Sequence, residues 1–287
     1  MTDEPITATL LISCRDQKGL VAAVSDFLYR NNGNIIHADQ HTDREEGVFL
    51  QRVEWELDGF EVPREEIEAT FKPIAQRFGM QWTLHFSDYA PRVALFVSKL
   101  PHCLYDLLGR WRMGELRGSV PLVISNHEDH RRVAEDHGTV FHCLPVSEDN
   151  KAAQESLAIK LLEEWEVDAV VLARYMQVLS PDFVARYPQR IINIHHSFLP
   201  AFAGARPYHQ AHERGVKIIG ATAHYVTPEL DQGPIIDQGV APVSHRDSVN
   251  DLIRKGRDLE RTVLARAVDL HLRNRVVVYG NKTVVFD

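Results

Sequence analysis

The chain has 287 residues, of which 44% are hydrophobic and 25% are charged, as in ordinary soluble globular proteins. Its formal charge of −8 at pH 7 argues against nucleic acid as the main partner, because phosphate backbones bind basic surfaces. The first five residues lack the charged and apolar regions of a signal peptide. No apolar run approaches the roughly 20 residues needed to span a bilayer, so we expect no membrane partner.

The three cysteines, Cys14, Cys103 and Cys143, lie far apart in the sequence and form no Cys-x-x-Cys pair. Free cysteines of this kind mostly behave as small hydrophobic residues. Their odd number and wide spacing favour a reducing compartment over a disulfide framework. We therefore expect a cytoplasmic protein.

Residues 8–86 show strand and helix patterns in the order β-α-β-β-α-β, which is typical of a ferredoxin-like unit. The first helix is predicted to start near Gly19, with Val24 and Leu28 on its apolar stripe, and the second opens at Pro63, a favoured first-turn residue. Strands are predicted at 9–14, 34–40, 48–57 and 81–86.

The segment Asp16–Leu28, continued by Asn34-Ile35, resembles the ACT family of small-molecule-sensing domains. The resemblance implies that subunits pair into a homo-oligomer and bind an amino-acid effector, such as glycine or methionine, at the paired surface. A purely structural dimerisation module is the alternative. The implied effector-binding residues are Asp16, Gly19, Leu20, Asn34 and Ile35.

A polar linker, Ser87–Pro91, separates this unit from an alternation of strands and helices. Runs such as 169–172 are apolar throughout, which indicates strands buried on both faces and hence a mostly parallel, doubly wound α/β sheet. Further strands are predicted at 218–226 and 234–242, then a long helix at 248–272 and a terminal strand pair. The predicted domains are 1–86 and 92–287.

Fifteen histidines invite a search for a metal site. The pairs His127-x-x-His130 and His209-x-x-His212 could each share one helix face. However, the sequence has no His-Glu-x-x-His motif, and no cysteine cluster accompanies the pairs. We therefore expect neither a metal nor a cofactor.

The stretch from Asn193 to Gly204 follows Ile191-Ile192, which is predicted to belong to a buried strand. Because side chains alternate along a strand, Asn193 and His195 share one face. Asp231 stands in a turn before Gly233-Pro234 and could meet them. An amide, an imidazole and a carboxylate can support acyl chemistry without a metal, although spacing alone also allows a buried polar network.

Three segments, 172–180, 195–204 and 230–236, resemble the formyltetrahydrofolate-using transferase and hydrolase family. The resemblance implies that Asn193 and protonated His195 stabilise the oxyanion that forms on the formyl group, while Asp231 orients His195. It also implies that the folate ring forms hydrogen bonds largely with backbone N–H and C=O groups. The implied folate-binding residues are Arg174, Tyr175, Met176, Gln177, Val178, Leu179, Glu229 and Leu230.

The segment Phe96–Cys103 bears on the identity of the formyl acceptor. It lacks the glycines with which purine-pathway transferases of the family hold a phosphorylated acceptor, and Pro101 has no N–H to donate. It resembles the branch of the family in which water takes the formyl group. Lys99 and His102 either line the emptied acceptor space or are solvated.

The expected reaction is therefore hydrolysis of 10-formyltetrahydrofolate to tetrahydrofolate and formate. This reaction would supply formate to purine synthesis and balance one-carbon folate pools. The folate is the substrate, so no separate cofactor is expected. Two alternatives remain: formyl transfer to an amine, as in glycinamide ribonucleotide transformylases, and a non-catalytic folate or amino-acid sensor.

Overall fold

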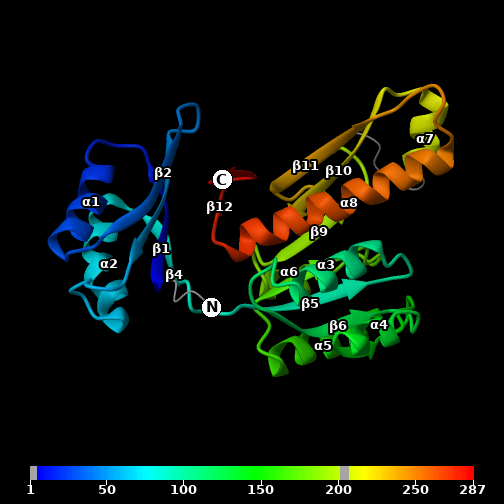
Figure 1. Ribbon diagram of the computed structural model, residues 1–287, viewed down its shortest axis with the longest axis horizontal. Coiled ribbons are helices and arrows are strands. Elements are labelled where there is room, and N and C mark those ends of the chain that lie inside the picture. Colours follow the sequence, from blue (N-terminus) through cyan, green and yellow to red (C-terminus); the bar gives the residue numbers. More distant parts are fainter. Residues whose placement is uncertain (1–4, 201–206) are drawn as a thin grey trace. The chain divides into compact units, whose positions relative to one another are not determined.

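The computed structural model describes residues 5–200 and 207–287 (Figure 1). The chain divides into two compact units, one formed by Met1–Ala90 with Asn274–Asp287 and the other by Pro91–Arg273. Within the described ranges, no helix combines the length and apolar character that crossing a membrane requires.

The first unit has the predicted β-α-β-β-α-β order and a four-stranded antiparallel sheet with strand order β2-β3-β1-β4. Its helices and strands bury one apolar core around Trp55 and Phe71. Gly19 precedes the first helix at φ +94°, a left-handed conformation that favours glycine. The elements are β1 (Thr7–Arg15), α1 (Leu20–Arg30), β2 (Ile35–Asp43), β3 (Val48–Glu56), the 3₁₀ helix η1 (Arg64–Glu66), α2 (Ile67–Phe78) and β4 (Gln81–Phe86).

A C-terminal hairpin of β12 (Val276–Tyr279) and β13 (Lys282–Val285) belongs to this first unit. Val277 and Phe286 form an apolar cluster with Leu50, which is fully buried. The Nε of Arg52 donates to the carbonyl of Asn274 at 3.0 Å. This arrangement differs from the predicted domain 92–287. The sheet presents apolar side chains on the face away from its helices, and the hairpin covers them.

The second unit contains a seven-stranded sheet with strand order β11-β10-β9-β8-β5-β6-β7, in which β5 to β9 are parallel and β10 and β11 antiparallel. The predicted α/β class is confirmed. The strands are β5 (Arg92–Val97), β6 (Ser119–Ser125), β7 (Val140–Cys143), β8 (Ala169–Leu172), β9 (Ile191–His195), β10 (Ile218–Tyr225) and β11 (Ile235–Pro242).

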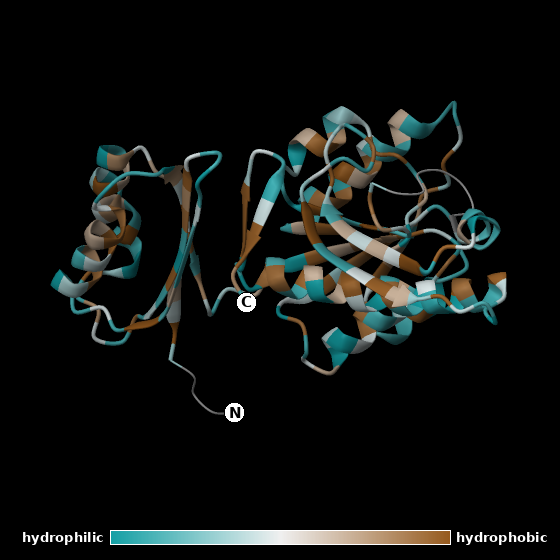
Figure 2. Cartoon of the chain, turned by 90° about the horizontal axis from the view of Figure 1, so that it is seen from above, coloured by the Kyte–Doolittle hydropathy of each residue, from teal (hydrophilic) through white to brown (hydrophobic). Residues whose placement is uncertain are grey.

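Helices cover both faces of this sheet (Figure 1). One face packs with α5 and α6 in a core around Phe96 and Phe183, whereas α8 packs against α3, β9 and β10. Figure 2 shows helices that carry both hydrophobic and hydrophilic residues, as partly exposed helices require. The helices are α3 (His102–Arg112), α4 (Arg131–Asp136), α5 (Lys151–Glu164), α6 (Pro181–Arg186), α7 (Pro207–Arg214), which was not predicted, and α8 (Val249–Leu272).

The topology puts a switch point beside β5. The chain runs outward from β5 through β6 to β7, and then returns to the other side of β5 through β8 and β9. Ligands of open α/β sheets bind at the carboxyl ends of strands at such a point. Ser98, Arg174 and His195 lie at the carboxyl ends of β5, β8 and β9.

Candidate active site

Asn193 and His195 lie on the same face of β9, as strand alternation predicts. In the antiparallel pairing of β9 with β10, His195 lies opposite Thr222 and Asn193 opposite His224. The His195 side chain is almost completely buried. The neighbouring strands therefore hold the amide and the imidazole in place at the edge of the sheet.

Asp231 reaches His195 from the loop between β10 and β11, with 3.1 Å between its Oδ2 and His195 Nδ1. The loop conformation depends on its residues: Asp231 has φ +56°, and a Cβ added to Gly233 would lie 1.7 Å from the carbonyl oxygen of Tyr225. Only glycine fits at that close approach. The backbone N–H of Tyr225 donates to the carbonyl of Pro234 at 2.9 Å and closes the loop.

The contact with Asp231 determines the chemistry of His195. The hydrogen bond with His195, helped by the nearby His224, lowers the pKa of the Asp231 carboxyl below its ordinary value. A carboxylate only accepts hydrogen bonds, so His195 Nδ1 carries a hydrogen. The other ring nitrogen, Nε2, is buried and has no hydrogen-bond partner within the described ranges. It is the atom left to contact a reacting group.

His224 is a site residue that the sequence analysis missed. It is 2% exposed, and its Nδ1 lies 2.8 Å from the carbonyl oxygen of Tyr225. Because a carbonyl only accepts, Nδ1 carries a hydrogen. Nε2 lies 3.2 Å from Asn193 Nδ2, which can only donate, and 3.6 Å from Asp231 Oδ1. Among the described residues, Asn193 Nδ2 has no other hydrogen-bond partner, so its second hydrogen can donate to a ligand. No sequence motif contains His224; only strand pairing places it beside Asn193.

A cavity of about 260 Å³ opens beside these residues. Its lining contains all three predicted catalytic residues and all eight predicted folate-binding residues. The side chains of Met176, Val178 and Leu230 are more than half exposed and border its mouth. The lining is formed by Leu172, Arg174–Leu179, Asn193–His196, His224 and Val226–Asp231.

The segment after β8 offers backbone groups to this cavity. Met176 N–H donates to Ser98 Oγ at 2.9 Å, and Ser98 Oγ in turn donates to Asn126 Oδ1 at 2.7 Å. In residues 5–200 and 207–287, the N–H groups of 177–179 have no hydrogen-bond partner. Polar groups that become buried need partners, so these groups suit a flat heteroaromatic ligand with its own donors and acceptors. The predicted motif residues Ala201–Gly204 lie outside the described residues.

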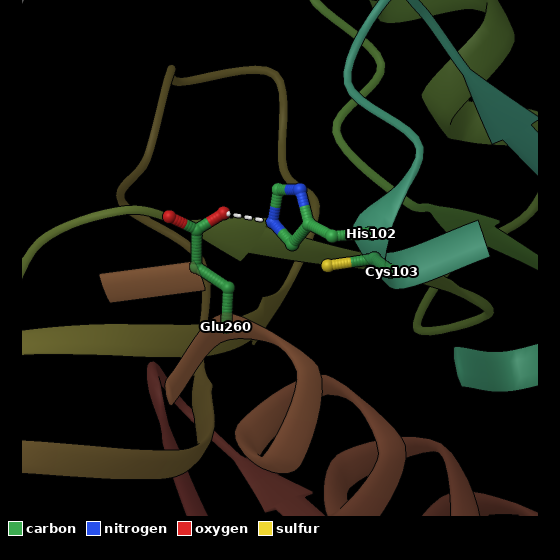
Figure 3. Close-up of side chains that lie close together, drawn as sticks. All are labelled: His102, Cys103 and Glu260. Atoms are coloured by element: carbon green, nitrogen blue, oxygen red, sulfur yellow. Dashed lines mark hydrogen bonds and ion pairs between the residues drawn. The ribbon is translucent and has the colours of Figure 1, made fainter. Parts of the chain in front are cut away.

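His102, Cys103 and Glu260 lie together at the start of α3 and on α8 (Figure 3), with their possible ligand atoms within 4.8 Å of one another. His102 Nε2 donates to Glu260 Oε2 at 2.8 Å. Two features disfavour a metal ion. Burial raises the pKa of the Cys103 thiol well above its usual value, and the cationic Arg174 lies 3.4 Å from the same carboxylate oxygen. His102 is thus not solvated, whereas Lys99 is exposed.

Sequence profiles match the two units separately. The family described as "ACT domain" matches residues 8–75, and the family described as "Formyl transferase" matches residues 91–268. A formyltetrahydrofolate deformylase from Synechocystis is 61% identical over 281 residues, which cover 98% of this chain and 99% of that protein. The chain belongs to the formyltetrahydrofolate deformylase family.

Solved structures agree with this assignment. The crystal structure of a formyltetrahydrofolate deformylase from Pseudomonas syringae has a TM-score of 0.97 and 47% identity, and the match covers 100% of this chain and 96% of that one. A glycinamide ribonucleotide transformylase from Symbiobacterium toebii matches less of the chain. Its TM-score is 0.66 and its identity 34%, over 71% of this chain and 98% of that one.

The ACT unit of this deformylase-family chain does not bring its five predicted effector-binding residues together. Asp16 and Gly19 precede α1, whereas Asn34 and Ile35 follow it, and an 11-residue helix is about 16 Å long. The Leu20 side chain is buried in the core. Asp16, Gly19, Asn34 and Ile35 are exposed. A single small amino acid therefore cannot contact all five residues within one subunit.

Proposed function

We propose that the protein hydrolyses 10-formyltetrahydrofolate to tetrahydrofolate and formate. The observation that carries the proposal is the convergence of Asn193, His195 and Asp231 at one cavity, with Nε2 of His195 and one amide hydrogen of Asn193 left for a substrate. The close relationship to deformylases over nearly the whole chain supports the same reaction. The expected biological outcome is formate for purine synthesis and a balanced one-carbon folate pool.

In the proposed mechanism, Asn193 Nδ2 and protonated His195 Nε2 donate to the formyl oxygen. Water attacks the formyl carbon and builds negative charge on that oxygen, which the two donors stabilise. The new C–O bond forms as the bond from carbon to N10 of the folate breaks. One proton of the water ends on N10, which gives tetrahydrofolate and formic acid, and the acid loses its other proton to solvent to give formate. Asp231 accepts from His195 Nδ1 and keeps the ring in the orientation that this role requires.

The proposed folate slot is the stretch Arg174–Leu179 with Glu229 and Leu230. Backbone N–H groups of 177–179 would pair with the pterin edge, and the apolar side chains would pack on its faces. Hydrogen bonds to backbone groups would hold the ring in one orientation, because any other orientation would leave buried polar atoms without partners, at a cost in binding free energy. This arrangement would present the formyl group at N10 to His195.

An acceptor-free assay tests the proposal. Purified protein is incubated with 10-formyltetrahydrofolate and no amine, and formate and tetrahydrofolate are measured with and without a chelator. Equal amounts of the two products, unaffected by the chelator, are expected of a metal-independent hydrolase. Release of formate only after an amine is added would identify a transferase, and binding without turnover would identify a sensor.

We further propose that the ACT unit pairs with a second copy and binds a small amino acid, such as glycine or methionine, at the paired surface. The exposed edge strand β2 supports pairing, because its unpaired backbone groups can extend a sheet. Light scattering of the full chain should give an oligomer, and calorimetry with each amino acid should detect binding. A monomer that binds neither amino acid would contradict this part. The three free cysteines support a reducing, cytoplasmic setting.

A further inference from the structure

A buried polar cluster lies next to the site. We call it the Glu260 cluster, formed by Glu260, His102, Tyr208 and Arg174. Glu260 is 1% exposed, and both of its oxygens are occupied: Tyr208 donates to Oε1 at 2.7 Å and His102 to Oε2 at 2.8 Å. Arg174 Nε lies 3.4 Å from Oε2. Although burial alone would raise the pKa of Glu260, the His102 hydrogen bond and the Arg174 charge lower it overall, so the group is a carboxylate.

The cluster depends on a specific helix residue. Gly256 lies one turn before Glu260 on α8, and a Cβ at that position would lie 2.0 Å from the Tyr208 hydroxyl oxygen. Any larger residue would displace the Tyr208 hydroxyl from its place beside the carboxylate.

The cluster continues directly from the catalytic histidine. The rings of His195 and His196 have centroids 5.0 Å apart, and those of His196 and Tyr208 are 6.3 Å apart. Beyond Tyr208 lies Glu260. Of the cluster, only Arg174 also lines the folate cavity. His196 also lines the folate cavity, and behind its ring Tyr208 and the Glu260 carboxylate follow in series. We take this side of His195 as the one that an incoming acceptor would use.

We propose that the Glu260 cluster restricts the formyl acceptor to water, and that His102 and Tyr208 are specificity-determining residues because they occupy the carboxylate that an amine would otherwise bind. This inference rests on the proposed function. An amine that attacked the formyl carbon would form a new C–N bond as the bond to N10 broke, and would lose a proton to N10. Such an amine needs space and an acceptor for its remaining N–H groups, and the cluster provides neither.

The test measures how the formyl group is divided between water and an added primary amine. The probe is glycinamide, added at increasing concentration to full-length protein with 10-formyltetrahydrofolate. The readout is the ratio of formylglycinamide to formate, corrected for the reaction without enzyme. This ratio does not depend on overall rate, so a general loss of activity would not change it. The wild-type ratio is expected to stay near zero.

His102→Ala should raise the ratio at least about tenfold, because it opens space and frees Oε2 while Glu260 keeps Arg174 as its counter-ion. Adding Glu260→Gln to this variant should reduce the gain, since the charge that attracts the amine is then lost. The matched control is His130→Ala, which removes another buried histidine, one that contacts the Lys99 carbonyl at 3.1 Å but not Glu260. Its ratio should equal that of wild type.

A ratio that stays at the wild-type level in folded His102→Ala would overturn the proposal, as would an equal rise in His130→Ala. Should His102→Ala not fold, Tyr208→Phe frees Oε1 without creating a cavity and is measured in the same way. A wild-type ratio in that variant would also reject the idea. Failure of the wild-type protein to release formate without an amine would instead contradict the proposed function itself.

Discussion

His224 Nε2 accepts a hydrogen bond from Asn193 Nδ2 at 3.2 Å, and this contact fixes the orientation of the Asn193 amide. The amide could otherwise present either its oxygen or its NH₂ group to a ligand. Only the NH₂ group can donate to an oxyanion. His224 is therefore expected to act through Asn193 as a positioning residue.

Replacing His224 with Phe keeps the ring volume and removes the acceptor. The expected loss in kcat is no larger than that of Asn193→Ala, at most about 10²- to 10³-fold. In the Asn193→Ala background, His224→Phe should lower kcat little further, because the two changes remove the same interaction. A double-mutant cycle on kcat measures this coupling. Independent, multiplicative losses would show that His224 acts by another route.

Asp231→Asn should leave the fold intact and reduce kcat by about 10²- to 10⁴-fold. Asparagine is neutral, so it no longer supplies the negative charge beside the protonated His195 ring that the proposed mechanism uses. Steady-state kinetics measures kcat, and circular dichroism checks that the fold is intact. Near-normal turnover in a folded variant would remove Asp231 from the mechanism.

Asn193→Ala should lower kcat by roughly 10²- to 10³-fold, which is the usual effect of removing one oxyanion donor. The effect should fall on kcat rather than on KM, because the hydrogen bond strengthens as charge develops on the formyl oxygen. Initial rates over a range of folate concentrations separate the two constants. A change confined to KM would mean that Asn193 only binds folate.

Gly233→Ala should displace the Asp231 loop, since the new Cβ would lie 1.7 Å from the Tyr225 carbonyl oxygen. We expect a loss of about 1–3 kcal/mol in the free energy of unfolding, together with lower kcat. The control is Gly215→Ala, at φ +65° with no atom within 4 Å of the added Cβ. It should lose stability through backbone strain alone and keep its turnover. Equal kcat in the two variants would refute the steric argument.

His196 should make stability depend on pH. Burial, followed by the positive charge of Arg174, lowers the pKa of His196 to about 4. An unfolded histidine has a pKa near 6.5, so between about pH 6.5 and 4 the unfolded chain binds the extra proton and stability falls as the pH falls. The free energy of unfolding of the wild type falls between pH 7 and pH 5, and His196→Gln should make this fall smaller by at most about 2 kcal/mol. Urea unfolding at both pH values compares the two proteins; identical losses would contradict this role.

Local patterns were enough to predict most elements of the fold and the two site residues on β9. The spacing of Asn193 and His195 directly encodes a shared strand face, and the turn around Gly233 marks the loop that carries Asp231. Other residues carry no such signal. His224 is one histidine in an apolar strand, and Glu260 is one charge in a long helix with many charges. Nothing local distinguishes them from structural or solvent-exposed residues.

The sequence by itself determined where strands and helices form and which side chains share a face, because these follow from backbone periodicity over a few residues. Tertiary structure alone decided that His224 pairs with Asn193, that Glu260 is buried among its partners, and that the C-terminal hairpin covers the first sheet. Those contacts join residues from 31 to more than 200 positions apart. They depend on strand register and on the packing of complete elements, which no short segment specifies.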